Sequence, residues 1–141
     1  MWVTESNPKI IKWEMKVSKT YGLTHLAIAV NDIERTLVFY QHIFDMQTMY
    51  HEKGFIQLTT PGSNDILVFE ETKDRPIGQT GGIAHFGFRL KDPAHIDEMV
   101  SKVISAGGTI VDQGEFVPGS PYVFFKDPDG YEVEIWYEVL K

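Results

Sequence analysis

Cysteine is absent from the 141 residues, which excludes a disulfide framework, a thiolate metal site and a cysteine nucleophile. Positive charge is scarce, because 13 Lys and Arg stand against 20 Asp and Glu, a formal net charge of −7. This balance argues against nucleic acid or an anionic membrane as a partner, since contacts to phosphate rely on basic side chains. No apolar run approaches the roughly 18–20 residues that cross a bilayer. The polar amino end also differs from a secretory signal, so we expect a cytoplasmic protein.

The residues that are present suffice for a folded core. Hydrophobic residues make up 43% of the chain, aromatic residues 13% and charged residues 23%. This composition excludes a disordered chain. At this length we expect one compact domain, or two small modules that share a core.

The chain contains an internal repeat. Residues 25–32 read His-Leu-Ala-Ile-Ala-Val-Asn-Asp and residues 85–92 read His-Phe-Gly-Phe-Arg-Leu-Lys-Asp, so each copy has an Asp seven positions after its His. The turn sequences Thr-Pro-Gly-Ser at 60–63 and Asp-Pro-Asp-Gly at 127–130 match at a similar offset. The two matches together indicate a duplication.

Each copy has the same predicted order of elements: a strand, a helix with an acidic N-cap, and three short strands separated by turns. In the first copy the strands fall at 23–30, 46–51, 55–59 and 65–71, and the helix begins at Asn31 or Asp32. In the second copy the strands fall at 83–90, 109–116, 122–126 and 131–137, and the helix begins at Asp92-Pro93. We therefore predict an α+β fold built from two tandem βαβββ modules.

These elements divide the chain into four segments. Residues 21–72 form the first module, 73–82 a linker, and 83–141 the second module. Residues 1–20 are an extension in which apolar and charged residues alternate. That alternation predicts either an extra strand that covers a sheet edge or an arm that clasps a second subunit.

Two of the five histidines, His25 and His85, occupy equivalent positions of the repeat. Each lies on the strand face that carries small neighbours, alanines in the first copy and Gly87 in the second. Bulky side chains would fill that face in an ordinary core, so the space favours a metal or ligand site. A single strand histidine, by contrast, is more often a hydrogen-bonded structural residue.

A divalent cation held by two neutral imidazoles usually takes an anionic oxygen as well. The last strand offers one, because Glu132, Glu134 and Trp136 share one face of it. Alternation alone leaves two interpretations of Glu134 open, a solvated surface carboxylate or a metal ligand.

The repeat carries a family resemblance. The tandem βαβββ order, the two histidine-bearing first strands, Phe39-Tyr40 in the first helix and Asp-Pro-Asp-Gly-Tyr-x-Val-Glu at 127–134 resemble the vicinal oxygen chelate superfamily over about residues 21–138. That superfamily includes glyoxalase I, extradiol dioxygenases, fosfomycin resistance transferases and bleomycin resistance proteins. The resemblance implies two curled mixed sheets around a metal-binding cup, but one fold supports many reactions.

The resemblance also implies a ligand set, because the family places metal ligands on the first and last strands of each module. His25, His85 and Glu134 match three of these positions, and aligning the two turn prolines puts Leu67 at the fourth. A site of two His and one Glu with open positions accepts Fe, Mn, Ni, Zn or Co. Glu134 is then also the candidate catalytic carboxylate.

The fourth position bears on the reaction class. In glyoxalase I, as the resemblance implies, this position carries a fourth protein ligand, usually Glu. Leu67 therefore argues against true glyoxalase I. A shifted register would bring Glu70 or Glu71 to the position instead. Extradiol dioxygenases keep three ligands, but their characteristic Tyr is replaced here by Phe124. His51 is a candidate substitute acid or base, or else a solvated histidine at a strand end.

Other members of the superfamily remain as alternatives. Fosfomycin transferases hold a phosphonate with several cations, whereas this cup offers only Arg89 as a candidate, which a salt bridge would also explain. Bleomycin resistance proteins bind a ligand without a metal. We therefore expect a metal-dependent small-molecule enzyme, dioxygenase-like or lyase-like, with a metal-free ligand-binding or antibiotic-resistance protein as the alternative.

The predicted substrate pocket is largely apolar, which favours an apolar or aromatic small molecule with a chelating oxygen pair. Ordinary packing between strands is the competing interpretation of each of its apolar residues. A homodimer is expected from the resemblance, with the modules paired within a chain or exchanged between chains. In an exchanged dimer, His25 would come from one subunit and His85 with Glu134 from the other. The pocket candidates are Leu67, Phe69, Arg89, Phe124 and Trp136.

Overall fold

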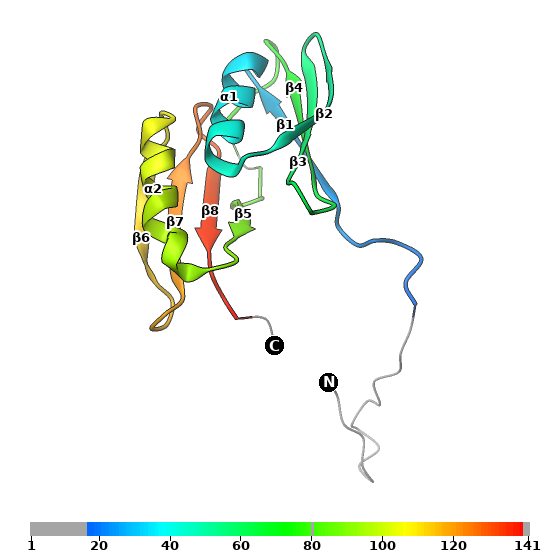
Figure 1. Cartoon of the computed structure of the whole chain (residues 1–141). Coiled ribbons are helices and arrows are strands. Elements are labelled where there is room, and N and C mark those ends of the chain that lie inside the picture. Colours follow the sequence, from blue (N-terminus) through cyan, green and yellow to red (C-terminus); the bar gives the residue numbers. More distant parts are fainter. Residues whose placement is uncertain (1–16, 80, 140–141) are drawn as a thin grey trace.

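The computed structural model describes residues 17–79 and 81–139, so the predicted strand or arm at the amino end lies mostly outside the described residues. The chain forms two similar modules (Figure 1). The first contains β1 (His25–Val30), α1 (Ile33–Phe44), β2 (Gln47–Glu52), β3 (Phe55–Thr59) and β4 (Ile66–Glu71). The second contains β5 (Phe86–Arg89), the short 3₁₀ helix η1 (Pro93–His95), α2 (Ile96–Ser105), β6 (Thr109–Glu115), β7 (Pro121–Lys126) and β8 (Glu132–Trp136).

Each module builds its own mixed sheet of four strands, ordered β1-β4-β3-β2 and β5-β8-β7-β6. The first strand of each module runs parallel to the last, and the other neighbours are antiparallel. The first strands β1 and β5 therefore both lie at sheet edges. This architecture confirms the predicted α+β fold of two βαβββ modules. No helix within the described parts of the chain has the length and apolar character needed to cross a membrane.

Local sequence explains where the helices begin and end. The Asp32 side chain accepts hydrogen bonds from the backbone amides of Glu34 and Arg35, which caps the start of α1. Asp45 ends α1 in the left-handed region, at φ 54°. In the second module the Asp92 side chain accepts from the Ala94 amide, and Pro93 occupies the first turn of η1.

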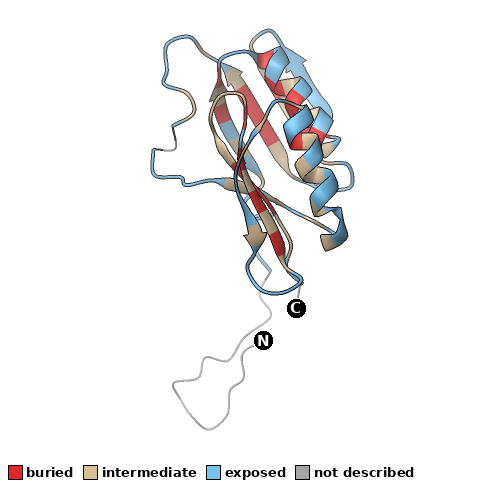
Figure 2. Ribbon diagram, turned by 90° about the vertical axis from the view of Figure 1, so that its left-hand side faces the viewer, coloured by how far each residue is buried: buried red, intermediate tan, exposed pale blue. Residues whose placement is uncertain are grey.

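The two helices lie side by side and cover one face of each sheet (Figures 1 and 2). Phe39 of α1 is buried and its ring centre lies 6.1 Å from that of Phe125 on β7. Phe44 stacks on Phe88 of β5 at 3.7 Å. The apolar core thus runs continuously through both modules. We call the opposite side of each sheet, away from the helices, its open face.

A buried hydrogen bond also links the modules. The Tyr40 hydroxyl on α1 donates to Asp127 Oδ2, 2.8 Å away, in the loop after β7. Asp127 Oδ1 accepts from the backbone amides of Asp129 and Tyr131. Burial raises the pKa of Tyr40 well above its ordinary value, and the nearby Asp127 carboxylate raises it further. Burial also raises the pKa of Asp127, although the Tyr40 hydrogen bond opposes that rise.

Removing this hydroxyl is expected to weaken the fold. Tyr40→Phe leaves the buried Asp127 Oδ2 without its donor, which costs about 1–3 kcal/mol of unfolding free energy. Tyr50→Phe is the matched control, because the Tyr50 hydroxyl also donates to a carboxylate, Glu52 Oε2, but at an exposed site. Urea unfolding of both variants measures the difference, and equal destabilisation would contradict a structural role for the buried bond.

Candidate metal and substrate site

The open face of the second sheet brings together two of the predicted ligands. His85 directly precedes β5, and its Nε2 lies 3.4 Å from Oε1 of Glu134 on β8. Gly87 pairs with Glu134 across the two strands, so no side chain of β5 intervenes. On the other side Phe124 of β7 pairs with Glu134, and its ring meets the His85 ring edge-on at 5.0 Å.

Glu134 is a nearly buried carboxylate, 8% exposed. Burial raises its pKa, while the neighbouring His85 acts in the opposite direction. A carboxylate that gives up much of its hydration needs a compensating partner. The solvated-surface interpretation of Glu134 therefore does not apply, and its carboxylate lies where a cation shared with His85 would compensate it.

The third predicted ligand lies on the other sheet. His25 is the first residue of β1, exposed, at the position equivalent to His85. Among residues 17–79 and 81–139, no three His, Asp or Glu side chains gather closely enough to hold a metal ion. One chain therefore assembles the His85–Glu134 pair but not the full set of three.

Leu67 is not the residue at the fourth position. Leu67 pairs with Leu26 and belongs to the core, although it also lines a cavity together with His25 and His85. Val68, by contrast, lies opposite Ala27 as Glu134 lies opposite Gly87. The alignment by turn prolines fails because the β3–β4 loop (60–65) is one residue longer than the β7–β8 loop (127–131). Valine binds no metal either, so a site of three protein ligands is still expected.

The shift of one residue in the register of β4 also affects the other candidates on this strand. Phe69, a predicted pocket residue, is fully buried against Tyr40, with ring centres 4.9 Å apart. Glu71, a candidate under a shifted register, accepts a hydrogen bond from the Ile33 amide at the start of α1. Glu70 shares the open face with Val68 but lies two residues further along β4, where Arg75 contacts it at 3.2 Å.

His51 does not reach the cup. It pairs with Ile56, a core residue, and its Nε2 lies 3.2 Å from Glu34 Oε1 on α1. Both contacts place His51 on the helix side of the first sheet. The structure therefore does not bring this candidate acid or base to the metal ligands, and the solvated strand-end interpretation is the closer one.

Arg89 lies on the open face but is already engaged. Its Nε and Nη2 donate to the backbone carbonyl of Glu138, at 3.1 and 2.5 Å. Its guanidinium also lies 5.3 Å from the ring centre of Trp136. Within the described part of the chain, backbone and ring contacts thus hold Arg89, and it forms no salt bridge.

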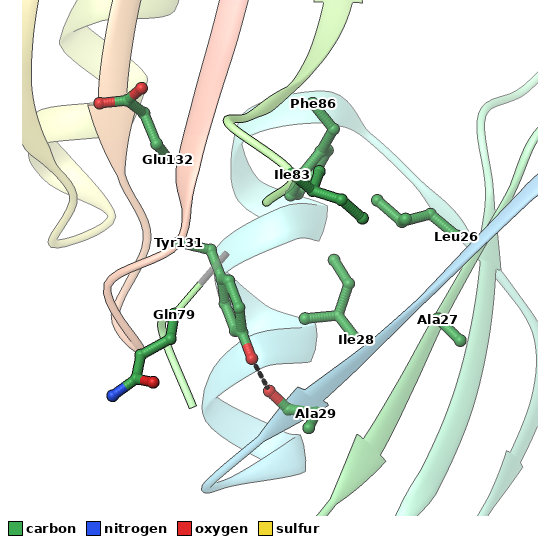
Figure 3. A pocket seen from close by; sticks show the side chains of 9 residues that line it. All are labelled: Leu26, Ala27, Ile28, Ala29, Gln79, Ile83, Phe86, Tyr131 and Glu132. Atoms are coloured by element: carbon green, nitrogen blue, oxygen red, sulfur yellow. Dashed lines mark hydrogen bonds between the residues drawn. The ribbon is translucent and has the colours of Figure 1, made fainter. Parts of the chain in front are cut away.

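Three cavities adjoin these residues. One of about 390 Å³ lies beside Glu134 and Trp136. A second, of about 580 Å³, separates β1 from β5 and is lined by both His25 and His85. The third, of about 180 Å³, shares Leu26, Ile83 and Phe86 with the second. Tyr131 also lines it, and the Tyr131 hydroxyl donates to the Ala29 carbonyl at 2.7 Å (Figure 3).

Comparison with known proteins points to one family. The model of the Glyoxalase/Bleomycin resistance protein/Dioxygenase superfamily matches residues 22–135. The chain is 29% identical over 125 residues to the uncharacterized protein PA2024 of Pseudomonas aeruginosa, covering 82% of this chain and 87% of that protein. It is 26% identical over 139 residues to a lactoylglutathione lyase of Arabidopsis thaliana, covering 89% of this chain. The match spans 47% of the plant lyase, about half its length.

Solved structures share the fold. The fosfomycin resistance protein FosX of Listeria monocytogenes superposes with a TM-score of 0.71 at 22% identity, covering 86% of this chain and 96% of FosX. A variant of the same FosX has been solved in complex with Mn(II) and 1S,2S-dihydroxypropylphosphonic acid.

Proposed function

Because the chain belongs to the Glyoxalase/Bleomycin resistance protein/Dioxygenase superfamily, we propose that it is a metal-dependent enzyme acting on a small molecule. A divalent ion, bound by His25, His85 and Glu134, would take the vicinal oxygens of the substrate in its open positions. The observation that carries this proposal is the 3.4 Å approach of His85 Nε2 to Glu134 Oε1 on an open sheet face. Two neighbouring ligands of one ion lie at about this separation.

The donor set suits the ion. Two imidazole nitrogens and one carboxylate oxygen bind Fe, Mn, Ni, Zn or Co, and open positions remain for substrate. The bound ion would supply stabilisation of the negative charge that develops on the substrate oxygens. The protein contributes a partly dehydrated ligand pair, and Glu134 Oε2, the oxygen that does not face His85, is the atom we assign to proton transfer. Both a lyase-like and a dioxygenase-like reaction would begin with the substrate oxygens bound to the ion in this way.

We further propose that the site is shared between two subunits of a homodimer. His85 and Glu134 lie together on the second sheet, whereas His25 belongs to the first sheet, and the described residues of one chain form no three-ligand cluster. Exchange of modules across a two-fold axis would complete two identical sites. The alternative function is a metal-free ligand-binding or resistance protein that uses the same cup.

Metal content tests the proposed function. The purified, reconstituted protein is expected to hold about one divalent ion per chain, and His85→Ala is expected to lose it, because only two ligands remain. His95→Ala is the matched control, since His95 is also exposed but lies in η1, away from the open face. Elemental analysis decides the matter. An absence of metal in the unaltered protein, after anaerobic reconstitution, would favour the metal-free alternative.

A further inference from the structure

A row of aromatic side chains crosses the open face of the second sheet and ends at His85. Phe116, directly after β6, stacks on Tyr122 with ring centres 4.3 Å apart and planes 21° apart. Tyr122 meets Phe124 edge-on at 5.6 Å, and Phe124 meets His85 edge-on at 5.0 Å. Phe116 is nevertheless 56% exposed. The row therefore begins with an aromatic ring that is free to receive a partner and ends at a proposed metal ligand.

The cavity of about 390 Å³ meets this row at Phe116 and reaches the proposed metal ligand Glu134. Its lining includes the apolar side chains of Phe116, Val117 and Trp136 together with Glu134. Its volume is within the range of small-molecule sites. A planar group in this cavity would contact aromatic side chains and have its polar end beside Glu134.

Charge around the cavity restricts the ligand. Among residues 17–79 and 81–139, the carboxylate-bearing Glu134 and Glu138 line it and no Lys or Arg does. The nearest cation named on this face, Arg89, is turned to the Glu138 carbonyl and the Trp136 ring. A third carboxylate, Asp112, accepts the Tyr122 hydroxyl at 3.0 Å. These three carboxylates outnumber the one guanidinium, so an anionic ligand would meet net negative charge on this face of the metal-free protein.

We propose that this cavity binds an uncharged aromatic ring, which is the apolar part of the substrate, and that it disfavours an anionic group on that ring. The proposal rests on the proposed function in placing the ring beside a metal ligand, Glu134. Stacking on Phe116 supplies affinity, and the surrounding carboxylates supply the discrimination.

Calorimetry on the metal-free full-length protein tests the proposal with two flat probes, 2-naphthol, which is neutral at pH 7, and 2-naphthoate, which is an anion. We expect 2-naphthol to bind at least about tenfold more tightly than 2-naphthoate. Phe116→Ala is expected to weaken 2-naphthol about tenfold through lost stacking and burial. Ile104→Ala is the matched control, because Ile104 is equally exposed, at 58%, but lies on α2.

A charge variant isolates the electrostatic part. Glu138→Gln is expected to tighten 2-naphthoate about two- to fivefold and to leave 2-naphthol unchanged. Equal affinity for the two probes, or an unchanged affinity in Phe116→Ala, would overturn the proposal. So would a Phe116→Ala variant whose association state changes while its 2-naphthol affinity does not, because the patch would then contact a second copy. Metal content is measured separately, so failure of the metal site and failure of the aromatic cavity give different results.

Discussion

Two variants that each lose their metal are expected to regain about one quarter of the sites when they are mixed. His25→Ala removes the ligand of the first sheet, and Glu134→Gln removes the carboxylate of the second. In a mixed dimer with exchanged modules, one site collects both substitutions and the other collects none. Random association makes about half of the dimers mixed, and half of their sites are intact. Equal amounts of the two variants are refolded together, and elemental analysis then gives the fraction of sites that hold metal.

The matched control uses two substitutions from the same sheet. His85→Ala and Glu134→Gln both damage the half-site that one chain assembles, so a mixed dimer contains two damaged sites and regains no metal. Activity on a substrate is not needed for either arm. If His25→Ala with Glu134→Gln also regains no metal, although each variant folds and forms dimers, the ligands come from one chain and the shared site is wrong.

Much of the fold was predictable from the sequence, because duplication makes the pattern redundant. The same order of a strand, a helix and three strands could be recognised in both halves of the chain. It was marked by the repeated His and Asp positions, by the capping residues Asp32 and Asp92, and by the turn residues between strands. The matching family model then confirmed the resemblance that these motifs indicated. The pairing of His85 with Glu134 was implied by that resemblance, because alternation along the last strand alone left Glu134 open as a solvated carboxylate.

For some residues the predicted sheet face was wrong, and in each case the structure shows a geometric reason. A single extra residue in the β3–β4 loop shifts the register of β4, which takes Leu67 away from the fourth ligand position and buries Phe69 in the core. In β2 an irregularity between Thr48 and Tyr50 reverses the alternation, so that His51 faces the helix. Neither a loop residue nor a bulge changes the apolar pattern enough to be recognised in one sequence.

Contacts between the modules were not predictable, because nothing local marks them. Tyr40 and Asp127 are separated by 87 positions in the sequence and meet only when the two modules pack together. Within the second module, the partners of Arg89 are also distant in sequence, because the Glu138 carbonyl lies 49 positions away. Such long-range contacts determine whether the modules behave as one folding unit.

The strongest expected effect on stability is at Phe39, which joins the two modules. Phe39→Ala is expected to lower the unfolding free energy by about 3–5 kcal/mol, because Phe39 is 2% exposed and packs between Tyr40 and Phe125. Val38→Ala, one position away on α1 and 66% exposed, is expected to change it by less than about 0.5 kcal/mol. Urea unfolding at a fixed subunit concentration measures both.

The shape of that unfolding curve tests a further consequence of the shared core. Since Phe39 of the first module contacts Phe125 of the second, loss of either module exposes the apolar surface of the other. We therefore expect one cooperative transition, followed equally by fluorescence and circular dichroism, in the unaltered protein. Two separate transitions, with Phe39→Ala shifting only one of them, would mean that the modules fold independently and that the interface between them contributes little stability.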